Sequence, residues 1–178
     1  MEQEVKESYI KEEILRKLQG RTMTEAAKCS QEIRKILKVK FPKIKFKVTS
    51  HNFAGGNSVD VGWIDGPAQE EVSNEIGHYE YGHFDGMTDC YEYSNSRNDI
   101  PQVKYLSIQR KLSIKTIKKY AEKMKEEWAE LKDISTSSSL IGNSFTFNGR
   151  YVNWSQLVWK ETYDINFDKE IKGGENGN

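Results

Sequence analysis

The chain has 178 residues, of which 36% are hydrophobic and 30% are charged, and its formal net charge is zero. This length fits one domain, or one domain with an appended module, and it can bury a core without disulfides or metal. No apolar run approaches the roughly 18 residues of a membrane span, and the charged N-terminus has no signal-peptide apolar region. With only two cysteines, which make no disulfide framework, we expect a cytoplasmic protein with reduced thiols.

Charge is segregated along the chain. Residues 32–47 carry seven Lys or Arg and one acid, and residues 104–125 carry eight against one Glu. Between them, residues 48–96 carry nine acids and no Lys or Arg. Such blocks can place opposite fields on different faces, or acidic strands and basic helices can neutralise each other across the fold. The sequence leaves both readings open.

Two helices are predicted first. Apolar spacing predicts one over residues 4–19, ending at Gly20. The second begins after Thr24, a good N-cap, contains Cys29 as a small core residue, and ends at Phe41-Pro42.

Strand periodicity then takes over. Residues 43–48 alternate Lys with apolar side chains, which predicts one basic solvated face and one buried face. After the turn AGGN, residues 58–64 alternate again, which places Trp63 in the core against the second helix. A short helix follows Asp65-Gly66-Pro67 and stops at Gly77.

Further strands and the longest helix follow. Residues 79–84 and 88–93 are extended around the turn DGM, and residues 103–110 form another strand. Ser113 then N-caps the longest helix, whose apolar residues repeat at heptad spacing over a short length. We expect that helix to dock on the sheet.

The C-terminal part contains a linker and a hairpin. Residues 133–144 are a Ser-rich linker, and Asn148-Gly149 in SFTFNGRYVNW is a strong signal for a two-residue hairpin turn. We predict an α+β fold whose largely antiparallel sheet is packed by two N-terminal helices and one long helix, with a C-terminal β-hairpin. The expected divisions are a helix over 1–22, a core domain over 23–132, the linker, a hairpin and aromatic segment over 145–170 packed on the core, and a disordered tail over 171–178.

The stretch HYEYGHFDGMTDCYEY, residues 78–93, is the densest in metal-binding residue types. His78 and His83 are five apart, whereas ligand pairs sit four apart on a helix and two apart on a strand. No second ligand pair of comparable quality exists, so we predict no metal and no cofactor. Cys90 is interpreted as a small buried residue. No nucleophile, metalloprotease or phosphate-loop motif is present, and we expect a non-enzymatic protein, although sites assembled from distant residues are invisible in one sequence.

Binding surfaces are more credible. Lysines on one strand face and one helix could track phosphates: Lys43, Lys45, Lys47, Lys115, Lys118 and Lys119. The acidic block offers the converse, a carboxylate surface that binds a protein where a nuclease expects phosphates; its candidates are Glu70, Glu71, Glu75, Glu80 and Asp85. A solvated basic face with no partner is the ordinary alternative.

Two motifs carry a family resemblance. VDVGWIDGP at 59–67 and FDGMTDCYEY at 84–93, preceded by the helix AAKCSQEIRKILKVKFP, resemble large polyvalent protein-associated domain 29 over about residues 24–113. In that family's second motif, Asp85 and Gly86 look like a fixed turn, with Gly86 at positive φ. No catalytic residues can be carried over.

The resemblance implies a protein of a phage or other mobile element, acting in a bacterial host cytoplasm. We therefore expect an inhibitor of a host defence nuclease, such as a CRISPR effector, that acts by protein–protein contact with the nuclease or its nucleoprotein complex. The alternative is an accessory factor that binds DNA or RNA and accompanies incoming DNA.

Overall fold

A computed structural model describes residues 23–167, and the predicted helix over 4–19 and the tail after 170 lie outside the described residues. Its elements in chain order are α2 (Glu25–Lys40), β1 (Lys47–Phe53), β2 (Gly56–Ile64), α3 (Gln69–Ile76), β3 (His83–Asp85), β4 (Cys90–Glu92), β5 (Tyr105–Lys111), α4 (Ile114–Glu127), β6 (Phe145–Phe147), β7 (Arg150–Val152) and α5 (Trp154–Glu161). Short 3₁₀ helices occupy Gly77–Tyr79 and Ala129–Leu131.

The central sheet has the order β1-β2-β5. β1 and β2 pair antiparallel, with Val48 opposite Val61, whereas β2 and β5 pair parallel, with Val61 opposite Ile108. The parallel pair is possible because residues 65–104, which include α3, form a crossover long enough to return the chain. β3–β4 and β6–β7 are separate antiparallel hairpins. The predicted α+β class, with mainly antiparallel pairing and a C-terminal hairpin, is confirmed.

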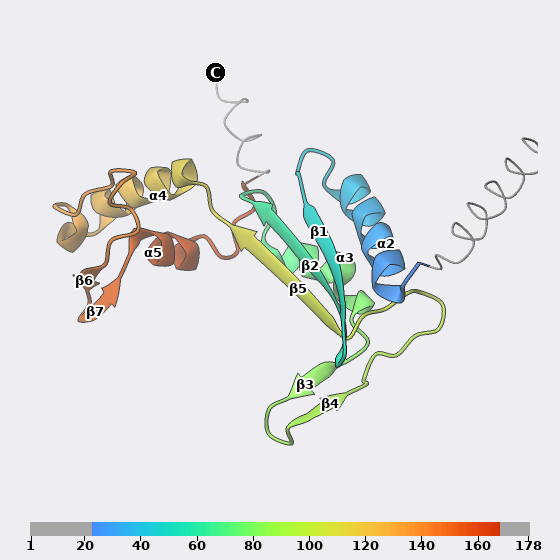
Figure 1. Ribbon diagram of the computed structural model, residues 1–178. Coiled ribbons are helices and arrows are strands. Elements are labelled where there is room, and N and C mark those ends of the chain that lie inside the picture. Colours follow the sequence, from blue (N-terminus) through green and yellow to red (C-terminus); the bar gives the residue numbers. More distant parts are fainter. Residues whose placement is uncertain (1–22, 168–178) are drawn as a thin grey trace, which may run out of the picture.

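One face of the sheet is covered by α2 and α3 (Figure 1). Alternate residues of β2 enter this first core, and Trp63 is only 3% exposed. Its ring lies 5.4 Å from that of Phe46, and its indole N–H donates to the carbonyl of Pro67 at 3.1 Å. Cys29 on α2 is fully buried in the same core. The core positions predicted for Trp63 and Cys29 are confirmed.

The long helix α4 lies elsewhere than expected. Its buried residues Ile117, Ala121 and Met124 belong to a second core, which they share with Trp154 and Val158 of α5. The prediction that this helix docks on the sheet was therefore wrong. Its heptad spacing specified an apolar stripe but not the partner, and α2 and α3 already cover the apolar face of the sheet.

Arg110 joins the two cores. It occupies a β5 position on the covered side, opposite Trp63, and is 5% exposed. Its guanidinium donates to the carbonyls of Thr162, Tyr163 and Ile165, which follow α5. The α4–α5 lobe therefore extends from the C-terminal end of β5, while the β3–β4 hairpin projects near the other end (Figure 1).

Caps and turns follow local chemistry. Thr24 and Ser113 accept hydrogen bonds from Ala27 N and Thr116 N, which confirms both predicted N-caps. Asn148 and Gly149 have φ values of 49° and 72°, as the predicted hairpin turn requires.

Candidate nucleic-acid interface

The second face of the sheet is covered by none of the described helices. Because side chains alternate between the two faces of a strand, every second residue of each strand points to this open face. The pairing register aligns them as Lys47, Thr49, His51 and Phe53 of β1, Ser58, Asp60, Gly62 and Ile64 of β2, and Tyr105, Ser107, Gln109 and Lys111 of β5. Polar and small side chains dominate its centre: Thr49, Asp60, Gly62, Ser107 and Gln109.

A groove of about 920 Å³ lies on this face. Its cationic lining is Lys43, Lys45, Lys47 and Lys111. None of these lysines forms an ion pair with another residue of the 23–167 segment. We call this hollow of about 920 Å³ the sheet groove.

The sheet groove contains one carboxylate, Asp60. Its Oδ2 lies 3.3 Å from His51 Nε2 on the neighbouring strand. The four lysines consequently outweigh the acid, and the groove is a cationic surface.

A second hollow of about 500 Å³, the α5 groove, adjoins the first, because Lys111 lines both. Its other lining includes Asn153, Ser155 and Gln156 at the start of α5, and Trp159. Trp159 is 39% exposed, and its ring meets that of Tyr163 edge-on at 5.0 Å.

The structure unites only half of the predicted lysine set. Lys43, Lys45 and Lys47 are exposed beside one another, as the alternation predicted, although β1 itself begins only at Lys47. Lys115, Lys118 and Lys119 lie on α4 and line neither groove.

Sequence reasoning missed Lys111, Ser107 and Gln109. The signal was present, because Ser107 and Gln109 alternate with Leu106, Ile108 and Arg110 along the strand predicted over 103–110, and Lys111 continues this period one residue beyond it. The same alternation places charged Arg110 on the buried side, which indicates that Arg110 must have hydrogen-bond partners.

The acidic candidates on α3 are only partly free. Glu71 is half-buried, and its carboxylate accepts hydrogen bonds from Ala68 N, at 3.1 Å, and from the Asn166 side chain. Glu75 forms an ion pair with Lys40 at 3.0 Å. Glu70 is exposed. Glu71, one of the carboxylates predicted for a protein-binding surface, therefore serves the fold, because it accepts from a backbone amide at the start of α3.

The remaining acidic candidates also have structural contacts. Glu80 accepts from Leu106 N at 3.2 Å, and its burial raises the pKa of the carboxyl. Asp85 accepts from Met87 N and Thr88 Oγ1, both at 2.9 Å, and these hydrogen bonds lower its pKa. Asp85 thus starts the turn as predicted, but the left-handed residue is Asp89, with φ of 53°, and not Gly86.

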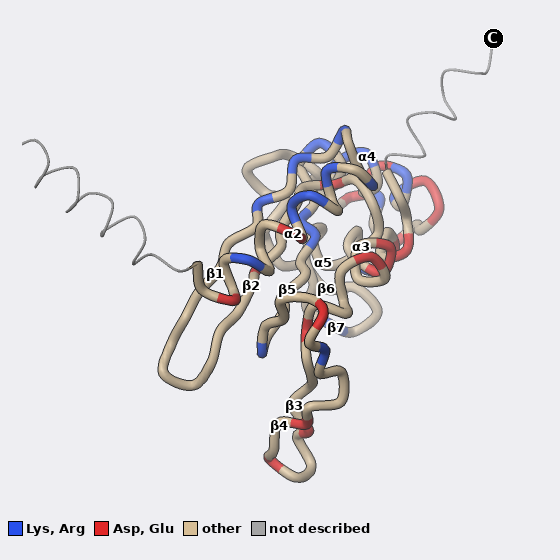
Figure 2. Tube along the Cα trace, turned by 90° about the vertical axis from the view of Figure 1, so that its right-hand side faces the viewer, with Lys and Arg blue, Asp and Glu red and all other residues tan. Residues whose placement is uncertain are grey.

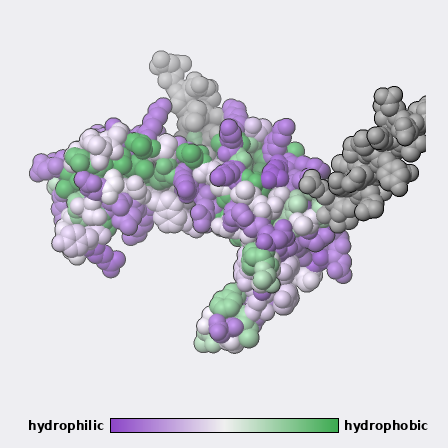
Figure 3. All heavy atoms as spheres, viewed as in Figure 1, coloured by the Kyte–Doolittle hydropathy of each residue, from purple (hydrophilic) through white to green (hydrophobic). Residues whose placement is uncertain are grey.

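The β3–β4 hairpin projects from the body as a finger with apolar residues on its surface (Figure 3). Phe84 and Met87 are exposed, Met87 by 96%. Figure 2 shows acidic residues on this finger and on α3, and basic residues gathered towards α4. Cys90 on β4 is exposed, so its interpretation as a buried residue was wrong; on this strand the neighbouring Tyr91, and not Cys90, packs against Tyr105.

The histidines of the finger region form no metal-binding cluster within the described part of the chain. His83 lies 3.5 Å from Glu92 and 3.2 Å from Ser94, and no group of three or more His, Cys, Asp or Glu side chains in residues 23–167 is placed to hold an ion. Among the same residues, no helix has the length and apolar character needed to cross a membrane.

Comparison with known proteins gives one match. The sequence model of large polyvalent protein associated domain 29 matches residues 24–122, more than half of the chain. The chain belongs to this family. The match contains the first core, the sheet groove and the start of α4, whereas α5 and the C-terminal hairpin lie beyond it. No curated protein and no solved structure matches the chain.

Proposed function

We propose that this protein binds nucleic acid through the open face of its sheet. The observation that carries this proposal is the sheet groove, whose lining includes four lysines, Lys43, Lys45, Lys47 and Lys111, and one carboxylate. These lysines have no ion-pair partner within residues 23–167 and can therefore contact phosphates, and each phosphate that they neutralise releases bound counterions.

This function is the accessory role rather than nuclease inhibition by an acidic surface. Glu71, Glu75, Glu80 and Asp85 each have a contact within the fold, and those contacts would compete with an intermolecular role. We further propose that the protein is non-enzymatic, comes from a phage or conjugative element, and acts on nucleic acid in the host cytoplasm.

Paired charge variants test the proposal. Lys43→Gln/Lys45→Gln/Lys47→Gln removes three charges from the sheet groove, and Lys115→Gln/Lys118→Gln/Lys119→Gln removes three from α4. Binding of a fluorescent DNA oligonucleotide is measured by anisotropy at several salt concentrations. The first variant should weaken binding and reduce the slope of log K against log salt by about 2, because each lost phosphate contact changes it by about 0.7–0.9.

The α4 variant should bind like the wild type. Equal losses for the two variants would mean that binding follows net charge alone. Absence of DNA or RNA binding by the wild type at low salt would rule out the proposed function.

A second candidate function is inhibition of a host defence nuclease by protein contact, and the exposed finger favours it. Phe84 and Met87 are exposed apolar residues on a projecting hairpin with Asp89 and Glu92 alongside, which suits an apolar pocket with a basic rim. Phe84→Ser/Met87→Ser should then abolish protection of phage DNA in a host that carries the nuclease. Under this candidate, the triple lysine variant of the sheet groove would protect fully.

A further inference from the structure

Building on the proposed function, we infer that the ligand of the open face is a single strand of nucleic acid, and that Trp159 in the α5 groove stacks on one of its bases. Exposed aromatic rings and lysines lie near one another on this side of the molecule.

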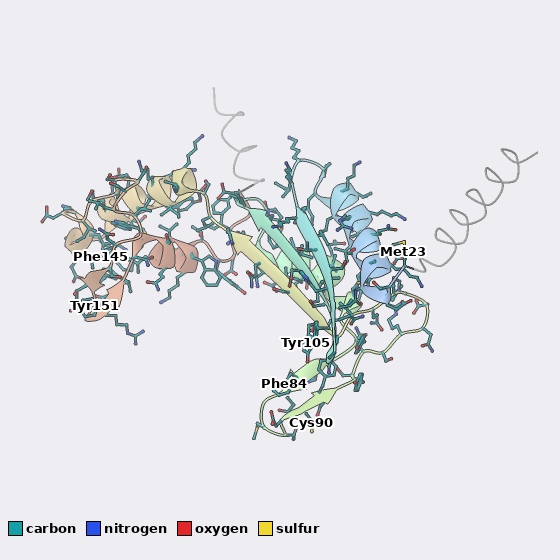
Figure 4. All side chains as sticks on the ribbon, viewed as in Figure 1. Met23, Phe84, Cys90, Tyr105, Phe145 and Tyr151 are labelled. Atoms are coloured by element: carbon teal, nitrogen blue, oxygen red, sulfur yellow. The ribbon has the colours of Figure 1, made fainter. Side chains whose placement is uncertain are left out.

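Exposed aromatic side chains lie on either side of the lysines, beyond the sheet groove on the open face and in the adjoining α5 groove. On one side, Phe53 and Tyr105 stack across the open face, with ring centroids 6.1 Å apart and an interplanar angle of 21°. They are 49% and 37% exposed. Tyr105 lies at the end of β5 next to the base of the finger (Figure 4). On the other side, Trp159 lies across Lys111 from the sheet groove.

Neighbouring groups hold these rings in place. Tyr105 meets Tyr91 edge-on at 5.6 Å, and Lys104 Nζ lies 5.5 Å from the Tyr105 ring centroid. Tyr91 is itself fixed by a hydrogen bond from its hydroxyl to the Lys104 carbonyl. Trp159 packs edge-on against Tyr163. Rings ordered before binding lose little entropy when a base stacks on them.

The exposed rings favour binding of single strands over binding of duplexes. A base exposes its flat face to an aromatic side chain only when it is not stacked inside a duplex, and each such contact contributes substantially to single-strand binding. Lysines alone would serve either polymer, because both present phosphates. Exposed aromatics beyond the sheet groove on either side therefore favour the single strand.

The length of the track gives the site size. β5 runs seven residues from Tyr105 to Lys111, or about 20 Å at ~3.3 Å per residue. A stacked strand advances about 3.4 Å per nucleotide and a stretched one advances more, so the sheet and Trp159 together take roughly four to six nucleotides. At the α5 end, the amide side chain of Gln156 and the hydroxyl of Ser155 line the hollow beside Trp159 and can hydrogen-bond a base edge.

The test compares oligothymidylate and oligouridylate of about twelve nucleotides with a duplex of equal length, by anisotropy at one salt concentration. Either single strand should bind at least about tenfold more tightly than the duplex. Trp159→Ala should weaken single-strand binding about tenfold, within the range for loss of one stacked base, and leave duplex binding unchanged. Tyr151→Ala is the matched control: Tyr151 is an exposed aromatic on β7, in the far lobe and outside both grooves (Figure 4).

Tryptophan fluorescence gives a readout that does not depend on the Ala variant folding well. Trp63 and Trp154 are buried, and Trp128 is half-buried and stacked on Phe147 at 4.8 Å, so Trp159, at 39%, is the exposed indole that a base can quench. Single-strand addition should quench the wild type, and Trp159→Phe should keep binding while losing most of the quench.

Equal affinity for single strand and duplex, with Trp159→Ala silent, would overturn this inference and leave the proposed function standing. Absence of binding to every nucleic acid would instead remove the proposed function itself.

Discussion

The two faces of the central sheet use their charged and aromatic residues differently. On the covered side, Trp63 and Arg110 are buried and hydrogen-bonded, and Glu71 and Glu80 accept hydrogen bonds from backbone amides at its margins. On the open face, the lysines form no ion pairs with described residues, and the aromatic rings remain partly exposed. Along one strand, residues on the covered side thus contribute to stability, and the residues between them are available for binding. Substitution of two adjacent positions can therefore separate the two roles.

The largest difference in unfolding free energy between adjacent substitutions is expected at Trp63 and Ile64 on β2. Trp63→Ala should reduce the free energy of unfolding by about 3–5 kcal/mol, because it removes a buried ring from the first core and leaves a cavity. Ile64 is 63% exposed on the open face, so Ile64→Ala should cost less than about 1 kcal/mol. Urea unfolding followed by circular dichroism measures both. A stable Trp63→Ala protein that has lost only binding would show that Trp63 acts at the surface.

Arg110 and Lys111 provide the same comparison on β5. Arg110→Met should cost about 3 kcal/mol, because it leaves the buried Thr162 carbonyl and the partly buried carbonyls of two further residues after α5 without their donor. Burial lowers the pKa of the guanidinium but an arginine stays charged, and Arg110→Lys cannot replace a fork that reaches three carbonyls. Lys111→Met should leave thermal unfolding unchanged and weaken nucleic-acid binding. Similar melting temperatures for Arg110→Met and the wild type would show that the junction of the two cores does not depend on this side chain.

Sequence patterns predicted local structure well. Period-two alternation placed Trp63 inside and Lys43, Lys45 and Lys47 outside, and side-chain chemistry identified the caps at Thr24 and Ser113. These features depend on residues close together in the chain, so one sequence contains them.

Features that depend on distant partners could not be predicted in the same way. The apolar stripe of α4 is satisfied by α5 and not by the sheet, and Glu71 is held by Asn166, 95 residues away. Lys111 joins Lys43–Lys47 only because β5 pairs parallel to β2, a choice that strand periodicity does not determine. The sequence therefore predicted the lysines before and on β1 as part of the candidate site, but not the β5 residues that lie beside them.

Glu71 and Glu70 extend the comparison to the acidic block. Glu71→Ala should cost about 1 kcal/mol, because it removes the carboxylate that accepts from Ala68 N at the start of α3. Glu70 is exposed in the same helical turn, so Glu70→Ala should change the unfolding free energy little. Thermal unfolding of the pair checks this. If Glu71→Ala keeps full stability but loses binding to a defence nuclease, the acidic-surface hypothesis regains support.

Replacing the Glu80 carboxyl with a neutral amide should raise the stability of the fold slightly at neutral pH. Burial raises its folded pKa, so the ionised carboxylate is less favourable in the fold than in the unfolded chain. This cost is absent below the ordinary carboxyl pKa, appears as pH rises through the raised pKa, and persists above it. Glu80→Gln retains an acceptor for Leu106 N. It should match the wild type in acid and become the more stable protein towards pH 7, as measured by melting temperature across pH. A variant less stable than the wild type at neutral pH would contradict this.

The smallest effect expected is on the stability of the open-face variant, and it is the most informative. Lys43→Gln/Lys45→Gln/Lys47→Gln removes three exposed charges that have no ion-pair partner among the described residues. Surface substitutions of this kind change the free energy of unfolding by about 0.5 kcal/mol or less each, and relief of repulsion between the lysines acts in the stabilising direction. Unchanged urea unfolding together with lost nucleic-acid binding would assign this face to binding alone. A marked loss of stability would instead mean that the lysines support the fold. The open face would then serve stability as well, like the covered face.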